Sequence, residues 1–243
     1  NLKLLRETNG QAECNLFKAM GLDYIYVDHG NDVGELIEAF QSVKDSKKPV
    51  VVHINTLKGK GYAPAEQNKE VWHYNGPFHI ETGEPLYEMT EEDYSDISMN
   101  YLLDKMKKDP AVVAITSGTP TVMGFTEDKR KEAGKQFVDV GIAEETAVAL
   151  ASGIAANGGK PVYGVYSTFV QRTYDQIAQD LCINNSPATI VTFCGSVYGM
   201  NDVTHLGLYD IPMMANIWYT LLRQRRKNTW QCSTGVSNRM SIR

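Results

Sequence analysis

The sequence predicts an α/β fold in which parallel sheets are flanked by helices. Short, nearly all-apolar segments alternate with helical segments along the chain, and such strands are typical of a parallel sheet covered on both faces. The chain has 243 residues, of which 42% are apolar, so it is long enough for one large or two small domains. The predicted strands are 49–56, 111–116, 136–140, 161–165 and 188–193.

The first 80 residues contain two predicted helical segments, 16–20 and 32–44, before the first of these strands. In the second segment the apolar residues share one face, and Asp32 with Glu35 has the spacing of a capping box. A polar, acidic stretch from 81 to 96 has no apolar period and predicts a linker. A helix is expected next, over 101–108.

A carboxylate stands where a predicted strand meets a predicted helix. The run Phe137–Glu145 reads FVDVGIAEE, and small and apolar residues follow it at helical spacing. Glu144 therefore lies in or before the first helical turn. From the residues alone, an acid there could simply complement the helix dipole, and Glu145 is the neighbouring alternative.

Three stretches in order resemble one family. Besides the strand–Ala–Glu run, Thr56–Glu66 reads TLKGKGYAPAE, with His73 at the family's spacing, and Tyr166–Gln176 reads YSTFVQRTYDQ. These motifs resemble those of 1-deoxy-D-xylulose-5-phosphate synthase, a transketolase-like enzyme family dependent on thiamine diphosphate. The resemblance covers nearly all of residues 10–217.

The resemblance implies a transferase that condenses pyruvate with glyceraldehyde 3-phosphate and releases carbon dioxide. It implies thiamine diphosphate and Mg²⁺ as cofactors, a homodimer and a cytoplasmic location. The expected domains are the end of a diphosphate-binding domain (1–80), a linker (81–97), most of a pyrimidine-binding domain (98–217) and a tail (218–243). The resemblance also implies that the product would feed isoprenoid, thiamine and pyridoxal synthesis.

The same resemblance assigns roles to single residues. Glu144 would share a proton with the cofactor's aminopyrimidine ring, so the cofactor's own amine can act as the base. The other assignments are a cofactor contact for Tyr62, Tyr166 and Phe169, a substrate contact for Arg172 and His205, and proton transfer for His73 and His205.

The chain departs from the family pattern in two places. Cys194 stands where members have an arginine and Asn201 where they have an aspartate, while Thr204 and His205 are kept. Residues 29–32 read His-Gly-Asn-Asp, where members usually read Asp-Gly-His-Asp. The lost arginine would have supplied a charge that pairs with a phosphate. The alternative that the chain belongs to a transketolase-like enzyme acting on another sugar phosphate is therefore left open. A non-catalytic half of a split enzyme is the other alternative.

The two ends of the chain also differ from the family. The Gly-Asp-Gly segment that would bind magnesium and the diphosphate is absent from these residues, so we expect an inactive internal fragment. Residues 218–243 hold six basic and no acidic residues, typical of a basic tail that contacts nucleic acid or an anionic membrane. However, a two-nucleotide frameshift can turn them into a family-like acidic sequence. We therefore expect a frameshifted, poorly packed tail.

Other functional classes find no support in the sequence. There is no signal peptide and no apolar stretch near 18 residues, so no membrane contact is expected. The four cysteines lack metal-ligand spacing and read as free thiols, the five histidines are scattered, and no protein-bound metal site is predicted. Nucleic acid is not an expected partner.

Overall fold

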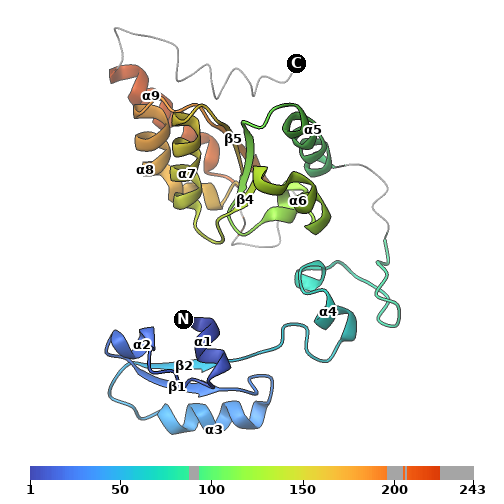
Figure 1. Ribbon diagram of the computed structural model, residues 1–243, viewed down its shortest axis with the longest axis vertical. Helices are drawn as coiled ribbons and strands as arrows, with labels where there is room; N and C mark the ends of the chain where they lie inside the picture. The colour runs from blue at the N-terminus through green and yellow to red at the C-terminus, as the bar shows by residue number, and fades with distance from the viewer. Residues whose placement is uncertain (88–92, 196–204, 206, 225–243) are drawn as a thin grey trace. The chain divides into compact units, whose positions relative to one another are not determined.

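The structure is a computed structural model that describes residues 1–87, 93–195, 205 and 207–224, with side chains up to 217. The chain divides into two compact units, Asn1–Thr90 and Glu91–Arg243, which we call unit 1 and unit 2. Figure 1 labels their helices and strands. Each unit is described by itself.

Unit 1 contains a parallel pair of strands joined by a helix. Strands β1 and β2 pair from Asp23 opposite Val50 to Val27 opposite Ile54. Figure 1 shows α1 and α2 on one side of this pair and α3 on the other. The elements are α1 (Leu2–Glu7), α2 (Leu16–Ala19), β1 (Asp23–Val27), α3 (Val33–Val43), β2 (Val50–Ile54), α4 (Ala63–Gln67) and the 3₁₀ turn η1 (Val71–His73).

The predicted elements of unit 1 are confirmed, but helices α1 and α4 and strand β1 were missed. The side chain of Asp32 caps α3, because its Oδ1 accepts a hydrogen bond of 3.0 Å from the Glu35 amide. Strand β1 was not predicted. Its sequence, DYIYV between Gly21 and Gly30, is rich in β-branched and aromatic residues and carried the signal.

Unit 2 is a four-stranded parallel sheet in the order β4-β3-β5-β6, with helices on both faces. In Figure 1, α7, α8 and α9 lie on one side of the strands and α5 and α6 on the other. The strands are β3 (Val112–Thr116), β4 (Phe137–Asp139), β5 (Lys160–Tyr166) and β6 (Thr189–Phe193). The helices are α5 (Tyr94–Lys108), α6 (Glu127–Ala133), α7 (Glu144–Ala156), α8 (Tyr174–Gln176) and α9 (Asp210–Gln224), with 3₁₀ segments η2 (Pro120–Met123), η3 (Gly134–Gln136) and η4 (Phe169–Thr173) and the π-helix η5 (Ile177–Ile183).

Each face of this sheet contributes to its own apolar core. Ile115, Tyr163 and Val165 pack with residues of α7, η5 and α9, whereas Ala114 packs with residues of α5 and α6 on the opposite face. The alternation follows from the period of two along a strand. The predicted parallel sheet with both faces covered is therefore confirmed.

Three predicted boundaries were wrong. Helix α5 begins at Tyr94 rather than 101, because the Asp93 side chain caps it through the Asp96 amide at 2.9 Å. Tyr166 ends strand β5 and does not open a helix. Helix α9 runs through Trp218 to Gln224, where no helix was expected, since that stretch contains no proline or glycine. The rest of the predicted tail, 225–243, lies outside the described residues.

Candidate functional site

The order of the strands in unit 2 creates a switch point. From β3 the chain moves to β4 on one side and then to β5 on the other. Ligands in open α/β sheets bind outside the carboxyl ends of the strands at such a point. The residues there are Thr116 and Ser117 at the end of β3, Tyr166 and Ser167 at the end of β5, and the start of α7.

Glu144 is the first residue of α7 and is 1% exposed. A tight turn carries the chain from β4 to this position. In that turn the Asp139 carboxylate accepts hydrogen bonds of 2.8 Å from the amides of Gly118 and Gly141. Gly141 has φ of 71°, a left-handed conformation that glycine adopts without strain. The turn thus places a buried carboxylate beside the carboxyl end of the sheet.

Arg172 is the ion-pair partner of this carboxylate. Its Nη1 lies 3.0 Å from Glu144 Oε2, and the arginine side chain is 49% exposed while that of the glutamate is 2% exposed. The sequence placed Arg172 near substrate but did not predict this pair. No local pattern could have done so, because the partners lie 28 positions apart on different elements.

Three aromatic rings form a cluster at the end of β5. Tyr166 and Phe169 meet edge to face at 5.4 Å between ring centroids, and His205 lies 5.7 Å from the first and 5.2 Å from the second. All three side chains are half-buried. Phe169 and Arg172 share one side of η4, since residues three apart eclipse in a 3₁₀ helix. The short segment η4 therefore carries both the Phe169 ring and the Arg172 guanidinium.

Hydroxyl groups lie buried at the same edge. Thr116 Oγ1 and Ser167 Oγ have no hydrogen-bond partner among the described residues. Ser117 Oγ lies 2.8 Å from Tyr163 Oη. Burial raises the pKa of Tyr163 above its usual range, the Ser117 hydrogen bond lowers it, and the charge of Glu144 raises it further. Tyr163 is therefore a neutral hydroxyl at physiological pH.

The described residues also set limits on other ligands. They contain no group of three or more His, Cys, Asp or Glu residues that could hold a metal ion. Within the same ranges, no helix combines the length and the apolar character needed to cross a membrane.

Comparison with known proteins identifies the family. Residues 91–222 match the family described as transketolase, pyrimidine binding domain. Residues 3–56 match 1-deoxy-D-xylulose-5-phosphate synthase. The chain belongs to the transketolase-like family. This confirms the family predicted from the motifs, and the α/β architecture is that of a thiamine-diphosphate-binding fold.

Two of the curated relatives agree with this family. The chain is 40% identical over 203 residues to 1-deoxy-D-xylulose-5-phosphate synthase from Natranaerobius thermophilus, covering 83% of this chain and 32% of the relative. It is 39% identical over 215 residues to synthase 1 from Geobacter sulfurreducens, covering 88% and 34%. A solved transketolase from Pichia stipitis, in complex with sedoheptulose 7-phosphate, is 15% identical with a TM-score of 0.44, covering 86% of this chain and 44% of that one. The chain thus spans about a third of the length of these curated relatives.

Tyr62 and His73, the two candidate site residues in unit 1, contact other residues of that unit. The Tyr62 ring packs against Trp72 at 5.0 Å and Phe78 at 5.8 Å between ring centroids. Its hydroxyl donates a hydrogen bond of 3.0 Å to the Ile80 carbonyl oxygen. His73 is exposed, and its Nδ1 contacts Lys58 Nζ. The roles of Tyr62 and His73 toward cofactor and substrate stay predictions.

Gly59, three residues before Tyr62, is needed for packing as well. A side chain at Gly59 would place Cβ 2.7 Å from the carbonyl carbon of Ala65, and Gly59 has φ of 83°. A substitution there would therefore disturb α4 itself. The motif reflects local folding in addition to any contact with a ligand.

The loop that departs from the family pattern is described in part. Cys194 is exposed and has φ of 54°. A Cβ added at Gly207 would overlap the backbone carbonyl oxygen of Cys194. The ends of the loop therefore touch beside Ser167, whose Oγ would be 2.9 Å from the same Cβ. Asn201 and Thr204 lie outside the described residues.

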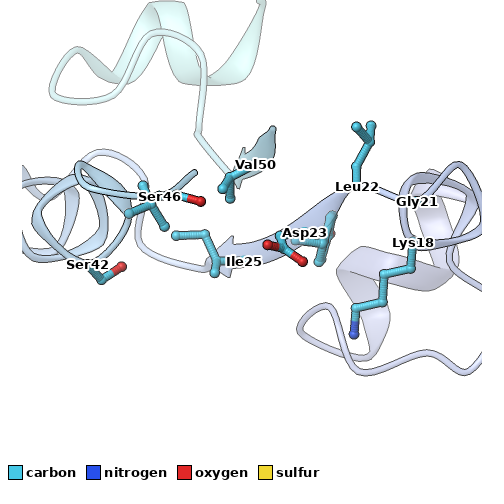
Figure 2. A pocket seen from close by; sticks show the side chains of 10 residues that line it. Lys18, Gly21, Leu22, Asp23, Ile25, Ser42, Ser46 and Val50 are labelled. Atoms are coloured by element: carbon cyan, nitrogen blue, oxygen red, sulfur yellow. The ribbon is translucent and has the colours of Figure 1, made fainter. Parts of the chain in front are cut away.

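Two hollows lie in unit 1, and none of the predicted site residues lines them. One of about 630 Å³ lies at the amino end of β1, and Figure 2 shows Lys18, Asp23, Ser42 and Ser46 among its lining side chains. The other, about 500 Å³, lies where β1 and β2 end. Its lining includes residues 29–32, which differ from the family pattern. In the second, Asn31 Oδ1 accepts a hydrogen bond of 2.7 Å from the Leu57 amide.

Proposed function

We propose that unit 2 forms the aminopyrimidine-binding half of a thiamine-diphosphate site, with Glu144 as the activating acid. The whole protein would condense pyruvate with glyceraldehyde 3-phosphate to 1-deoxy-D-xylulose 5-phosphate, with loss of carbon dioxide. The observation that carries the proposal is the burial of Glu144 at the carboxyl edge of the sheet. Relatives about 40% identical and named as this synthase support the reaction.

The residues at this edge fit an aromatic ring with a basic nitrogen. Glu144 can hold a proton at that nitrogen, because its surroundings exclude water. Tyr166 and Phe169 offer ring faces and edges, and Ser167 Oγ is a buried hydroxyl without a partner in the described structure. When bound, thiamine diphosphate supplies the nucleophilic carbon that side chains lack.

The remaining roles follow from the family and are part of the proposal. Tyr62 would contact the cofactor, Arg172 and His205 would lie near the substrate, and His73 and His205 would move protons. Mg²⁺ would bind with the diphosphate through a Gly-Asp-Gly segment that these 243 residues do not contain. We also propose a homodimer in the cytoplasm for the whole protein.

The assay of the chain by itself is direct. Without the magnesium and diphosphate ligands, the 243 residues should release no carbon dioxide from pyruvate when thiamine diphosphate and Mg²⁺ are added. Release that depends on the cofactor would contradict this assignment of the missing ligands.

A chimera tests the site. The matching region of the Natranaerobius thermophilus synthase is replaced by that of this chain, and carbon dioxide release is measured. Glu144→Gln keeps the shape of the side chain but removes the acid, so kcat should fall at least about 100-fold. Glu145→Gln is the matched control and should have far less effect, because Glu145 is only half-buried. Equal losses would show that the carboxylate is misassigned.

A different acceptor is the second candidate, favoured by Cys194. If the lost arginine pairs with the acceptor phosphate, Cys194→Arg in the chimera should lower KM for glyceraldehyde 3-phosphate. If the chimera instead prefers a longer sugar phosphate, and Cys194→Arg leaves this KM unchanged, the transketolase-like alternative is favoured. A chimera that folds but is inactive with every acceptor would favour the non-catalytic half of a split enzyme.

A further inference from the structure

The ion pair between Glu144 and Arg172 occupies the atom that the proposed chemistry needs. Nη1 of the arginine lies 3.0 Å from Oε2 of the glutamate. The glutamate is almost fully buried, so its carboxylate has lost most of its hydration. An unpaired buried carboxylate is unstable as an anion and takes up a proton instead.

Arg172 is suited to hold this charge. A guanidinium stays protonated and donates in a fixed plane, so it both neutralises and orients a carboxylate. Half of its side chain remains exposed, so it can leave the carboxylate without unfolding η4. The amino end of α7 adds a smaller favourable field at Glu144.

The other charged and titratable groups around the pair do not replace Arg172. Tyr163 from β5 is neutral, and Glu145 on α7 has the same charge as Glu144. The segments α8 and η5, which contact α7, carry Asp175 and Asp180, and these are also acidic. Among the described residues, Arg172 is the ion-pair partner of Glu144.

We propose that Arg172 is a positioning residue that pairs with the buried carboxylate of Glu144 and holds it in one orientation before any ligand binds. Only one consequence rests on the proposed function: an aminopyrimidine ring must take Oε2 from Arg172 when it binds. The positioning role itself concerns the chain without cofactor, so it can fail or hold independently of the proposed reaction.

The test is a double-mutant cycle on the full chain, measured by urea unfolding between pH 4 and pH 8. Arg172→Met should raise the unfolding equilibrium constant at pH 7 at least about tenfold. An ion pair between a carboxylate and a guanidinium is lost when the carboxylate is protonated at low pH. The loss of stability should therefore be small at pH 4 and grow as the pH rises.

The Glu144→Gln background provides the decisive comparison. In that background, Arg172→Met should raise the unfolding equilibrium constant less than about threefold at every pH. In the wild-type background, Arg172→Lys should be more stable than Arg172→Met. The pair Lys160 and Asp109 at the surface is the matched control. In the same kind of double-mutant cycle, the coupling between these two residues should change the unfolding equilibrium constant by less than about fivefold. A loss that is independent of pH, or that persists in the Glu144→Gln background, would overturn the proposal and leave Arg172 a packing residue.

If Arg172→Met does not fold at pH 7, the same cycle is run with Arg172→Lys. Because lysine has a single ammonium group in place of the planar guanidinium, Arg172→Lys should raise the unfolding equilibrium constant at least about threefold at pH 7. This increase should vanish in the Glu144→Gln background. A cost that stays would overturn the proposal.

Discussion

Units 1 and 2 use the same local pattern, a strand, a helix and a parallel strand, but they bury very different amounts of side chain. In unit 2, Ala114, Ile115 and Tyr163 are completely buried in the sheet. In unit 1 every residue of β2 is only half-buried, although four of the five are valine or isoleucine. Helix α3 leaves Val33, Ile37 and Phe40 more than half exposed.

The difference lies in the number of strands in each sheet, two in unit 1 and four in unit 2. Each central strand of unit 2 has a strand on both sides and helices on both faces, so its residues are enclosed in every direction. The two strands of unit 1 each have one neighbour, and a two-stranded sheet is marginal by itself. The carboxyl edge of the unit 2 sheet can therefore bury a carboxylate away from water, as it does for Glu144.

A matched pair of valines gives the largest expected contrast. Val165→Ala removes two methyl groups from a side chain that is 1% exposed and should cost about 2 kcal/mol. Val52→Ala removes the same atoms from half-buried β2 and should cost less than about 1 kcal/mol. Urea unfolding followed separately for each unit by hydrogen exchange measures both. Equal costs would mean that β2 is as well packed as β5.

Tyr163→Phe tests the buried polar contact of unit 2. Losing the hydroxyl leaves Ser117 without its 2.8 Å partner and should cost about 1 kcal/mol at pH 7. Burial raises the pKa of Tyr163, so the folded state keeps its proton after the unfolded chain has lost it. The stability of the wild type should therefore fall as the pH rises above about 10. In the variant this fall should be shallower, as pH-dependent urea unfolding would show; an unchanged slope would contradict the assignment.

The helix caps give the smallest contrast and should be the same in both units. Asp32→Ala removes the cap of α3 and Asp93→Ala that of α5, and each acceptor binds the amide three residues on. Each change should cost about 1 kcal/mol, because a cap is a local, exposed interaction. Thermal unfolding of the two variants checks this. A much larger cost in unit 2 would mean that capping depends on the surrounding core.

Local patterns in the sequence predicted most elements of the fold. Apolar strands and a capped helix around Asp32 were legible because they depend on neighbours in the chain. The start of α5 was misplaced, because its first turn is polar and only the Asp93 cap marks it. Strand β1 was missed although its composition carried the signal.

By itself the sequence determined the parallel α/β architecture, the family and the identity of Glu144 as the candidate acid. Strand period, helix capping and motif spacing are short-range properties, so they can be read along the chain. Only the tertiary structure paired Glu144 with Arg172 and gathered Tyr166, Phe169 and His205 into one cluster. The pair of Glu144 with Arg172 and the contacts of His205 with the other two rings join residues far apart in sequence. Burial and charge pairing depend on the elements that enclose these residues.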